Sequence, residues 1–393
     1  MKPALNAERP VYLVDDEKGF RRCLDALDAA PRVGVDTEAN SFHAYRERVC
    51  LIQAATSEAE WIVDPLSVDV TALGDLFRDE QREVVFHAAE FDIASLKRSF
   101  GFSFCSLFDT QVAAMLLGMG QLGYSALVKQ FLDLDIKKGQ QRSDWGRRPL
   151  NEKQISYAAA DVRYLLTLRE RLGRMLESRG RLGEAQSLFS RLAEVRPHRR
   201  VFDPEGFYRI KGYRDLDPPG RAVARALYLA REKRAQKIDR APFRVLGNEV
   251  LMGIADQRPI EIEQLNKIKG IPADTRREFS RGILGAVKMG LGDLEPPPPK
   301  RARRTESAVN RGGASASEAE RMFDHLRAWR NRVSVERGID SQLVLRNELL
   351  REIARRPPEK ISDLGQFDGM DVHAIRSYGS QILRVLQEVR TRK

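Results

Sequence analysis

The chain has 393 residues, of which 42% are hydrophobic, and its formal net charge at pH 7 is +11. A chain of this length can build two or three globular units. It has no run of about 18 apolar residues and no apolar segment near its first residue, which argues against a membrane span or secretory signal and predicts a cytoplasmic protein. Cys23, Cys50 and Cys105 lie far apart in sequence, so we expect neither a disulfide framework nor a zinc cluster.

The positive charge is unevenly distributed along the chain. The first 195 residues carry a net charge of −3, whereas the remaining residues carry +14. Cationic side chains displace counterions from phosphates, so this asymmetry favours a polyanionic partner for the C-terminal half. The alternative is a charge excess that only keeps the protein soluble.

The first part of the chain alternates short apolar runs with segments of helical periodicity, which predicts a mixed α/β sheet followed by helices. The predicted strands lie near 11–14, 33–35, 49–52, 61–63 and 84–86. The predicted helices lie near 68–79, 90–99, 109–117 and 151–177.

Several polar residues in this part occur in pairs whose spacing places both members on the same face of a strand or helix. Residues 32–38 are predicted to form a short strand, and strand side chains alternate in direction, so Asp36 and Glu38 project from the same face. Tyr157 and Asp161 are four residues apart on a predicted helix, and therefore lie one turn apart on one face. Asp92 follows the last predicted strand. Building a core requires none of these polar groups.

A gathering of four ionised carboxylates would raise the pKa of each member unless positive charge lay among them. Two divalent cations would balance that charge, and two metals can clamp the attacking and leaving oxygens of a displacement at phosphorus. Oxygen-only ligands favour Mg²⁺ or Mn²⁺ over zinc. The acids therefore predict metal-dependent phosphodiester chemistry.

The order of these residues resembles a known family. Asp36-x-Glu38, then Asp92, then Tyr157-x-x-x-Asp161 is similar to the motif series of DEDD exonucleases of the tyrosine subgroup. Surrounding segments extend the resemblance to bacterial ribonuclease D, and these segments are 35–38, 50–53, 85–92, 143–150 and 157–162.

The resemblance implies an α/β ribonuclease-H-like domain that removes nucleotides from RNA in the 3′→5′ direction. It implies that Asp36, Glu38, Asp92 and Asp161 bind metal and that Tyr157 orients the attacking water. A phenol with an ordinary pKa near 10 is a poor base at neutral pH, which favours orientation over proton abstraction.

Four further residues are candidates for contact with nucleic acid. Trp145, Arg147 and Arg148 have the chemistry to meet a terminal nucleotide by stacking and charge, although a core position is an equal alternative for the tryptophan. His87 lies near the site in the resembling family without binding metal, and a hydrogen-bonded position at a strand end is its alternative.

The C-terminal half contains an internal repeat. An offset of 99 residues aligns two copies without a gap, and the apolar positions within each copy have the three-and-four spacing of a buried helix face. The aligned pairs include Leu227 with Leu326, Arg231 with Arg330, Leu246 with Leu345, Asn248 with Asn347, Pro259 with Pro358, and Gly270 with Gly369.

Each copy is predicted to form a small all-α helical bundle. Both copies resemble HRDC domains, which accompany ribonuclease D and certain helicases. A segment rich in proline, then in glycine and serine, separates the copies and has the composition of a basic linker. The predicted units are an exonuclease domain at 1–180, a helical connector at 181–212, a first HRDC domain at 213–292, the linker at 293–317, and a second HRDC domain at 318–393.

Together these observations predict a 3′→5′ exoribonuclease that releases nucleoside 5′-monophosphates with two Mg²⁺ or Mn²⁺ ions. The resemblance suggests tRNA precursors with single-stranded 3′ ends as substrates. Two alternatives remain open at this point: a 3′→5′ DNA exonuclease that uses the same acids, and a non-catalytic RNA-binding scaffold.

Overall fold

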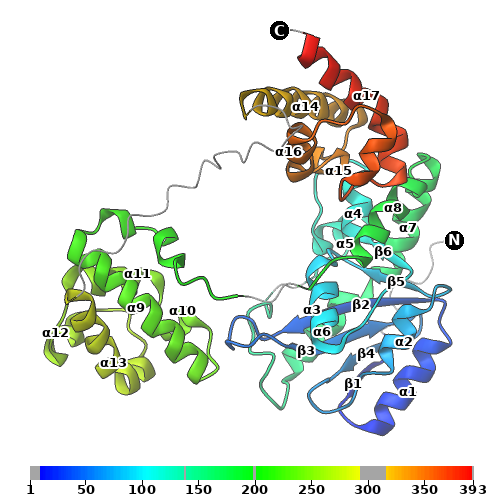
Figure 1. Ribbon diagram of the computed structural model, residues 1–393. Helices are drawn as coiled ribbons and strands as arrows, with labels where there is room; N and C mark the ends of the chain where they lie inside the picture. Colours follow the sequence, from blue (N-terminus) through cyan, green and yellow to red (C-terminus); the bar gives the residue numbers. More distant parts are fainter. Residues whose placement is uncertain (1–8, 137–138, 198–200, 293–315, 392–393) are drawn as a thin grey trace.

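The structure is a computed structural model that describes residues 9–136, 139–197, 201–292 and 316–391 (Figure 1). It contains a six-stranded sheet with surrounding helices, followed by two helical modules. We call residues 206–291 the first module and residues 316–391 the second module. The predicted linker at 293–317 lies almost entirely outside the described residues, and the predicted domain limits remain predictions.

The sheet has the strand order β1-β4-β3-β2-β5-β6. The β2/β3 and β3/β4 pairs are antiparallel, and the other three pairs are parallel. This mixed sheet confirms the expected fold class. The strands are β1 (Val11–Val14), β2 (Arg32–Ala39), β3 (Val49–Ala55), β4 (Glu60–Val63), β5 (Glu83–Phe86) and β6 (Leu107–Asp109).

Eight helices accompany the sheet within the described residues. The single helix predicted at 151–177 is two helices in the structure, because the helix is interrupted at Tyr164. The helices are α1 (Glu17–Asp28), α2 (Leu73–Arg78), α3 (Glu90–Phe100), α4 (Thr110–Leu116), α5 (Tyr124–Leu132), α6 (Glu152–Arg163), α7 (Leu165–Ser178) and α8 (Leu182–Ala193).

The sheet is central to the core. Every residue of β3 is buried, which explains why its apolar run shows no alternation. Helix α8 lies inside the predicted connector, and its Ala185 and Phe189 belong to the same apolar core as the sheet. Of the three cysteines, Cys23 and Cys50 are buried and Cys105 is exposed.

The two helical modules repeat one architecture. The first contains the short 3₁₀ helices η1 (Gly206–Arg209) and η2 (Tyr213–Asp215), then α9 (Pro218–Lys237), α10 (Pro242–Val245), α11 (Asn248–Gln257), α12 (Ile262–Lys267) and α13 (Ala273–Leu291). The second contains α14 (Ala316–Arg337), α15 (Ser341–Val344), α16 (Asn347–Arg355), η3 (Ile361–Gln366) and α17 (Val372–Thr391).

A buried arginine makes the same contacts in both modules. Nη1 of Arg231 donates to the carbonyl of Leu246 at 2.9 Å and to the side chain of Asn248 at 2.8 Å. Ninety-nine residues later, Arg330 donates to Leu345 at 3.0 Å and to Asn347 at 2.8 Å. The repeat is therefore a repeat of hydrogen bonds as well as of apolar positions.

The second module packs on the sheet unit beside α8, and their apolar residues form one continuous core (Figure 1). At the contact, Nη1 of Arg337 donates to Glu184 Oε1 at 2.9 Å, and Arg181 donates to the Arg337 carbonyl at 2.8 Å. Glu184 is buried. An ion pair with little exposure thus joins α8 to the second module.

The first module touches the sheet unit at a different place, the loop between β2 and β3. Tyr45 of the loop donates to Glu232 at 2.7 Å, and the amide of Ala241 donates to the carbonyl of His43 at 3.0 Å. The rings of Phe42 and Phe243 meet edge to face at 6.4 Å. This loop directly follows the strand that carries Asp36 and Glu38. Within the described residues, the structure has no helix long and apolar enough to cross a membrane.

Candidate active site

The first acidic pair lies on β2, on the face covered by α6. Asp36 pairs across the sheet with Gln53 of β3, and Glu38 pairs with Leu51. Opposed residues of an antiparallel pair point to the same face. Leu51 packs in a cluster with Ala158 of α6, so both acids project toward that helix as the strand alternation predicts.

Asp92 reaches the same place from the first turn of α3. The chain turns sharply before this helix, with Ala88 in the left-handed conformation at a φ of 59°. Buried Asp109 secures the turn, because its carboxylate accepts the amides of Ala88 at 3.2 Å and Ala89 at 2.7 Å. Thr37 Oγ1 then donates to Asp92 Oδ1, joining α3 to β2.

The last two predicted site residues lie on α6. Asn151 and Gln154 begin this helix with reciprocal side-chain to backbone hydrogen bonds, which fix where its turns start. Tyr157 and Asp161 face the acids of β2 one turn apart, and the phenol is hydrogen bonded to the carboxylate. Three elements therefore bring together all five residues that the motif series contains.

The pKa values of the four carboxylates are all raised, by burial and in two cases by the charges of the other acids. Burial raises the pKa of Asp36 well above its usual range, and the charges of Asp92, Asp161 and Glu38 add to the increase. Burial together with Asp161 and Asp92 raises the pKa of Glu38 to about 9. The pKa of Asp92 and that of Asp161 each rise to about 7, chiefly through burial. Four acids that resist ionisation together need a positive partner.

The donor set fits hard divalent cations, because all four groups are carboxylates and none is a thiolate or an imidazole. In the part of the chain that the structure describes, no three His, Cys, Asp or Glu side chains are arranged as a formed metal centre. The carboxylates thus share one environment without surrounding a common point in this conformation.

Gln53 is a residue of this environment that the sequence motifs did not single out as functional. Its side chain is fully buried opposite Asp36, and neither its amide nitrogen nor its amide oxygen has a hydrogen-bond partner among the described residues. A buried amide without partners costs free energy, and this one lies beside an acid of the site.

The four predicted nucleic-acid contacts have different surroundings. Trp145 is fully buried with its ring 6.1 Å from that of Tyr157, which favours the core alternative over stacking on a base. Arg148 binds Asp64 and the carbonyl of Cys50, so it braces the sheet. His87 Nδ1 lies 2.9 Å from Thr110 Oγ1, and burial lowers the pKa of its imidazole.

Arg147 differs from these three because its side chain is exposed to solvent. It lies in the turn between buried Trp145 and Arg148, and that turn leads into α6. An exposed cation on a segment braced on both sides is well placed to meet a phosphate.

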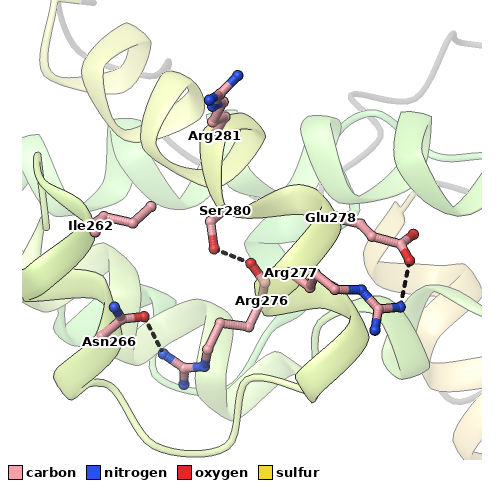
Figure 2. Close-up of a pocket in the computed structure, with 7 residues that line it drawn as sticks. All are labelled: Ile262, Asn266, Arg276, Arg277, Glu278, Ser280 and Arg281. Carbon is pink, nitrogen blue, oxygen red and sulfur yellow. Dashed lines mark hydrogen bonds and ion pairs between the residues drawn. The ribbon is translucent and has the colours of Figure 1, made fainter.

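A hollow of about 440 Å³ lies in the first module, away from the acids (Figure 2). Arg276 crosses its floor and donates to Asn266 at 3.1 Å and to the carbonyl of Ile268 at 2.9 Å. Arg277 pairs with Glu278 at 2.9 Å, and Arg281 is exposed nearby. The lining is cationic and polar, in agreement with the basic C-terminal half.

Two sequence families match this chain. Residues 11–177 match the family described as 3′-5′ exonuclease, and residues 220–287 and 319–386 each match the HRDC domain. The two HRDC matches are offset by the same 99 residues as the internal repeat. The families coincide with the sheet unit and with the two helical modules.

The chain is similar to curated bacterial proteins over most of its length. It is 36% identical to ribonuclease D of Gluconacetobacter diazotrophicus over 286 residues, which are 72% of this chain and 70% of the relative. It is 30% identical to ribonuclease D of Jannaschia sp. over 367 residues, which are 91% and 90% of the two chains.

Solved structures share the fold. The catalytic core of RRP6 from Trypanosoma brucei is 26% identical with a TM-score of 0.66, over 72% of this chain and 80% of that chain. Escherichia coli RNase D is 23% identical with a TM-score of 0.61, over 96% and 99% of the two chains. At the latter identity the likeness concerns the fold alone.

Proposed function

We infer the reaction from the premise that this chain belongs to the ribonuclease D family and is a 3′→5′ exoribonuclease. We propose that it hydrolyses the terminal phosphodiester bond of RNA and releases nucleoside 5′-monophosphates. The observation that carries this proposal is the gathering of Asp36, Glu38, Asp92 and Asp161 from three separate elements, close enough that the charges of Asp92 and Asp161 raise the pKa of both Asp36 and Glu38. Acids would not be gathered in this way without a function.

Divalent metal ions are typical of exonucleases with this carboxylate set, and we propose that two Mg²⁺ or Mn²⁺ ions serve here. Asp36, Glu38, Asp92 and Asp161 would hold them. When bound, such ions lower the pKa of water and neutralise charge that develops on the phosphate oxygens. The protein contributes a set of oxygen donors whose repulsion is relieved by the cations.

Tyr157 is the proposed orienting group for the attacking water. Burial and the nearby charges of Asp161, Glu38 and Asp36 raise the pKa of its phenol further above its usual value, so the hydroxyl keeps its proton. A neutral phenol that is hydrogen bonded to Asp161 can accept a hydrogen bond from the attacking water and so orient the lone pair of that water. The phenol cannot remove a proton from the water near neutral pH. Trp145 packs behind the ring and limits its movement.

Substrate recognition is proposed to be divided between the site and the modules. Among the predicted nucleic-acid contacts, Arg147 is exposed to solvent, and it lies ten residues before Tyr157. We propose that it contacts a phosphate at the end of the RNA. The arginine-lined hollow of the first module would meet the backbone farther along the strand. Precursors of tRNA with single-stranded 3′ ends are the substrates that we propose.

The direct test is an exonuclease assay on a short single-stranded RNA with a label at its 5′ end. We expect a ladder of products that shorten one nucleotide at a time, nucleoside 5′-monophosphates as the released species, and no reaction in EDTA. Release of the labelled 5′ nucleotide without a ladder, or equal rates with and without EDTA, would contradict the proposal. Absence of cleavage with either metal would indicate a binding scaffold.

A matched DNA strand separates the two nuclease alternatives. The acids and Tyr157 are compatible with either sugar, because recognition of the 2′-hydroxyl depends on contacts that the acids do not make. We expect the RNA strand to be degraded faster than the DNA strand of the same sequence. A faster DNA reaction would instead support a DNA exonuclease.

A further inference from the structure

A second tyrosine lies close to the acids, at the first position of α5. Tyr124 is partly buried, and its ring lies 5.7 Å from that of His87. Its hydroxyl donates to the carbonyl of Ala160 at 3.0 Å and accepts from the amide of Tyr164, also at 3.0 Å. The motif series of the sequence does not include this residue.

The two groups that the phenol joins are four residues apart at the end of α6. In an uninterrupted helix, the amide of Tyr164 would donate directly to the carbonyl of Ala160. Here the hydroxyl of Tyr124 stands between them, donating to the carbonyl and accepting from the amide, which is also directed at the carbonyl of Val162. Insertion of a side chain into the ladder is a recognised cause of helix breaks, and α6 ends while α7 begins at this point.

The break lies directly beside Asp161, which follows Ala160 in sequence. Two other contacts hold the same end of α6 against the sheet. Arg163 binds fully buried Glu60 of β4 through two hydrogen bonds of 2.8 and 2.7 Å. On β2, a Cβ on Gly34 would lie 3.1 Å from the Cβ of Leu165, so the absence of a side chain lets the junction approach the strand.

These contacts have different effects. The Arg163 pair and the close approach at Gly34 determine how near α6 lies to the sheet. The phenol of Tyr124 determines where the helix stops, and therefore the direction in which its last turn presents the carboxylate. The hydrogen bond to Ala160 also satisfies a carbonyl that a helix end otherwise leaves without a partner.

We propose that Tyr124 is a positioning residue that sets the orientation of Asp161 by interrupting the helix ladder between Ala160 and Tyr164. This inference rests on the proposed function, in which Asp161 is a metal ligand. Tyr124 itself touches neither metal nor substrate. Its removal should act through the metal site, because outer groups that orient a ligand commonly change metal affinity about 10–100-fold.

The test replaces only the hydroxyl, in the full-length chain. We expect Tyr124→Phe to bind Mn²⁺, measured by isothermal titration calorimetry without RNA, at least about 10-fold more weakly than the unmodified protein. We expect kcat to fall by about 10–100-fold at fixed metal concentration, while KM for RNA changes little. Added Mn²⁺ should recover part of the lost turnover.

Tyr228→Phe is the matched control, because that phenol of the first module also donates to a backbone carbonyl, that of Asp203 at 3.1 Å, in the segment that precedes the module. Measurements are made at a temperature at which circular dichroism shows each variant to be folded. If Tyr124→Phe matches Tyr228→Phe in Mn²⁺ affinity and kcat, Tyr124 is only a structural residue and the inference is wrong.

Asp161→Asn distinguishes failure of this inference from failure of the proposed function. If Asp161→Asn loses Mn²⁺ affinity and turnover while Tyr124→Phe retains both, Asp161 is a ligand that does not depend on Tyr124. If Asp161→Asn retains both, the ligand assignment itself fails.

Discussion

Thr37 Oγ1 donates a hydrogen bond to Oδ1 of Asp92, so the residue between the two acids of β2 holds the acid of α3. Both side chains are buried. We expect Thr37→Val to lower kcat by about 10-fold or more, because a displaced ligand loses its working geometry, with only a small change in melting temperature. Steady-state kinetics on a 5′-labelled RNA provides the measurement. Thr37→Ser keeps the hydroxyl and should remain active, and an inactive serine variant would refute the assigned role.

The amide of Gln53 lacks hydrogen-bond partners among the described residues, so its replacement should raise stability and lower activity. Gln53→Leu replaces a buried polar group that lacks partners by an apolar group of similar size. We expect the free energy of unfolding to rise by about 1–3 kcal/mol, measured by urea denaturation without metal. We expect turnover to fall because the group beside Asp36 is lost. A variant that is less stable than the unmodified protein would show that the amide has a partner in solution.

The acids of the site predict how the stability of the metal-free protein depends on pH. Burial raises the pKa of Glu38 to about 9 and those of Asp92 and Asp161 to about 7, all above the values of about 4 in an unfolded chain. The folded state therefore binds more protons in this interval, and its stability falls as pH rises from about 5 to about 9.

Mg²⁺ should reverse that loss, because binding to the folded state alone stabilises it by mass action. We expect the melting temperature in Mg²⁺ to exceed that in EDTA, and the difference to grow with pH. Thermal melts at several pH values in the two buffers measure this difference. The double variant Asp36→Asn, Glu38→Gln is the control and should flatten the response. A difference that shrinks as pH rises would contradict the charge argument.

The contact between α8 and the second module depends on an ion pair. Glu184 has 6% of its side chain exposed and Arg337 has 26%, and Arg337 is also hydrogen bonded to the hydroxyl of Tyr378. Arg337→Met leaves the buried glutamate with only the imidazole of His373, 4.0 Å away, as an ion-pair partner among the described residues, so we expect a loss of about 1–3 kcal/mol in urea denaturation. Limited proteolysis should then release the second module more readily.

Pairing that change with Glu184→Leu gives the matched control. Removal of both charges leaves no buried ion without a partner, so the double variant should recover part of the lost stability. If the double variant loses as much as the sum of the two single variants, the pair is not coupled and the contact depends on packing alone.

Sequence reasoning predicted what local periodicity determines. The alternation along β2 placed Asp36 and Glu38 on one face, and the repeat placed Arg231 and Arg330 in equivalent positions. Helix α1 was missed although its signals were present, because Asp16 has the side chain of an N-cap and Phe20 begins a helical apolar stripe.

The remaining features depend on contacts between distant segments. The break between α6 and α7 arises from the hydroxyl of Tyr124, which accepts a hydrogen bond from an amide forty residues later in the chain. No pattern within 151–177 predicts this break. The shared core of α8 and the second module likewise depends on how the modules pack. The apolar run at 49–52 places Gln53 just after a predicted strand, but no local pattern shows that its amide lacks a partner among the described residues.

The central claim is that carboxylates from β2, α3 and α6 together perform metal-dependent hydrolysis at RNA 3′ ends, and Asp36→Ala tests it most directly. The measurement compares hydrolysis of a 5′-labelled RNA in Mg²⁺ with binding of the same RNA, for this variant and for the unmodified chain. We expect hydrolysis to be abolished and RNA binding to be largely retained. A variant that still shortens the RNA from its 3′ end at an undiminished rate would contradict the account.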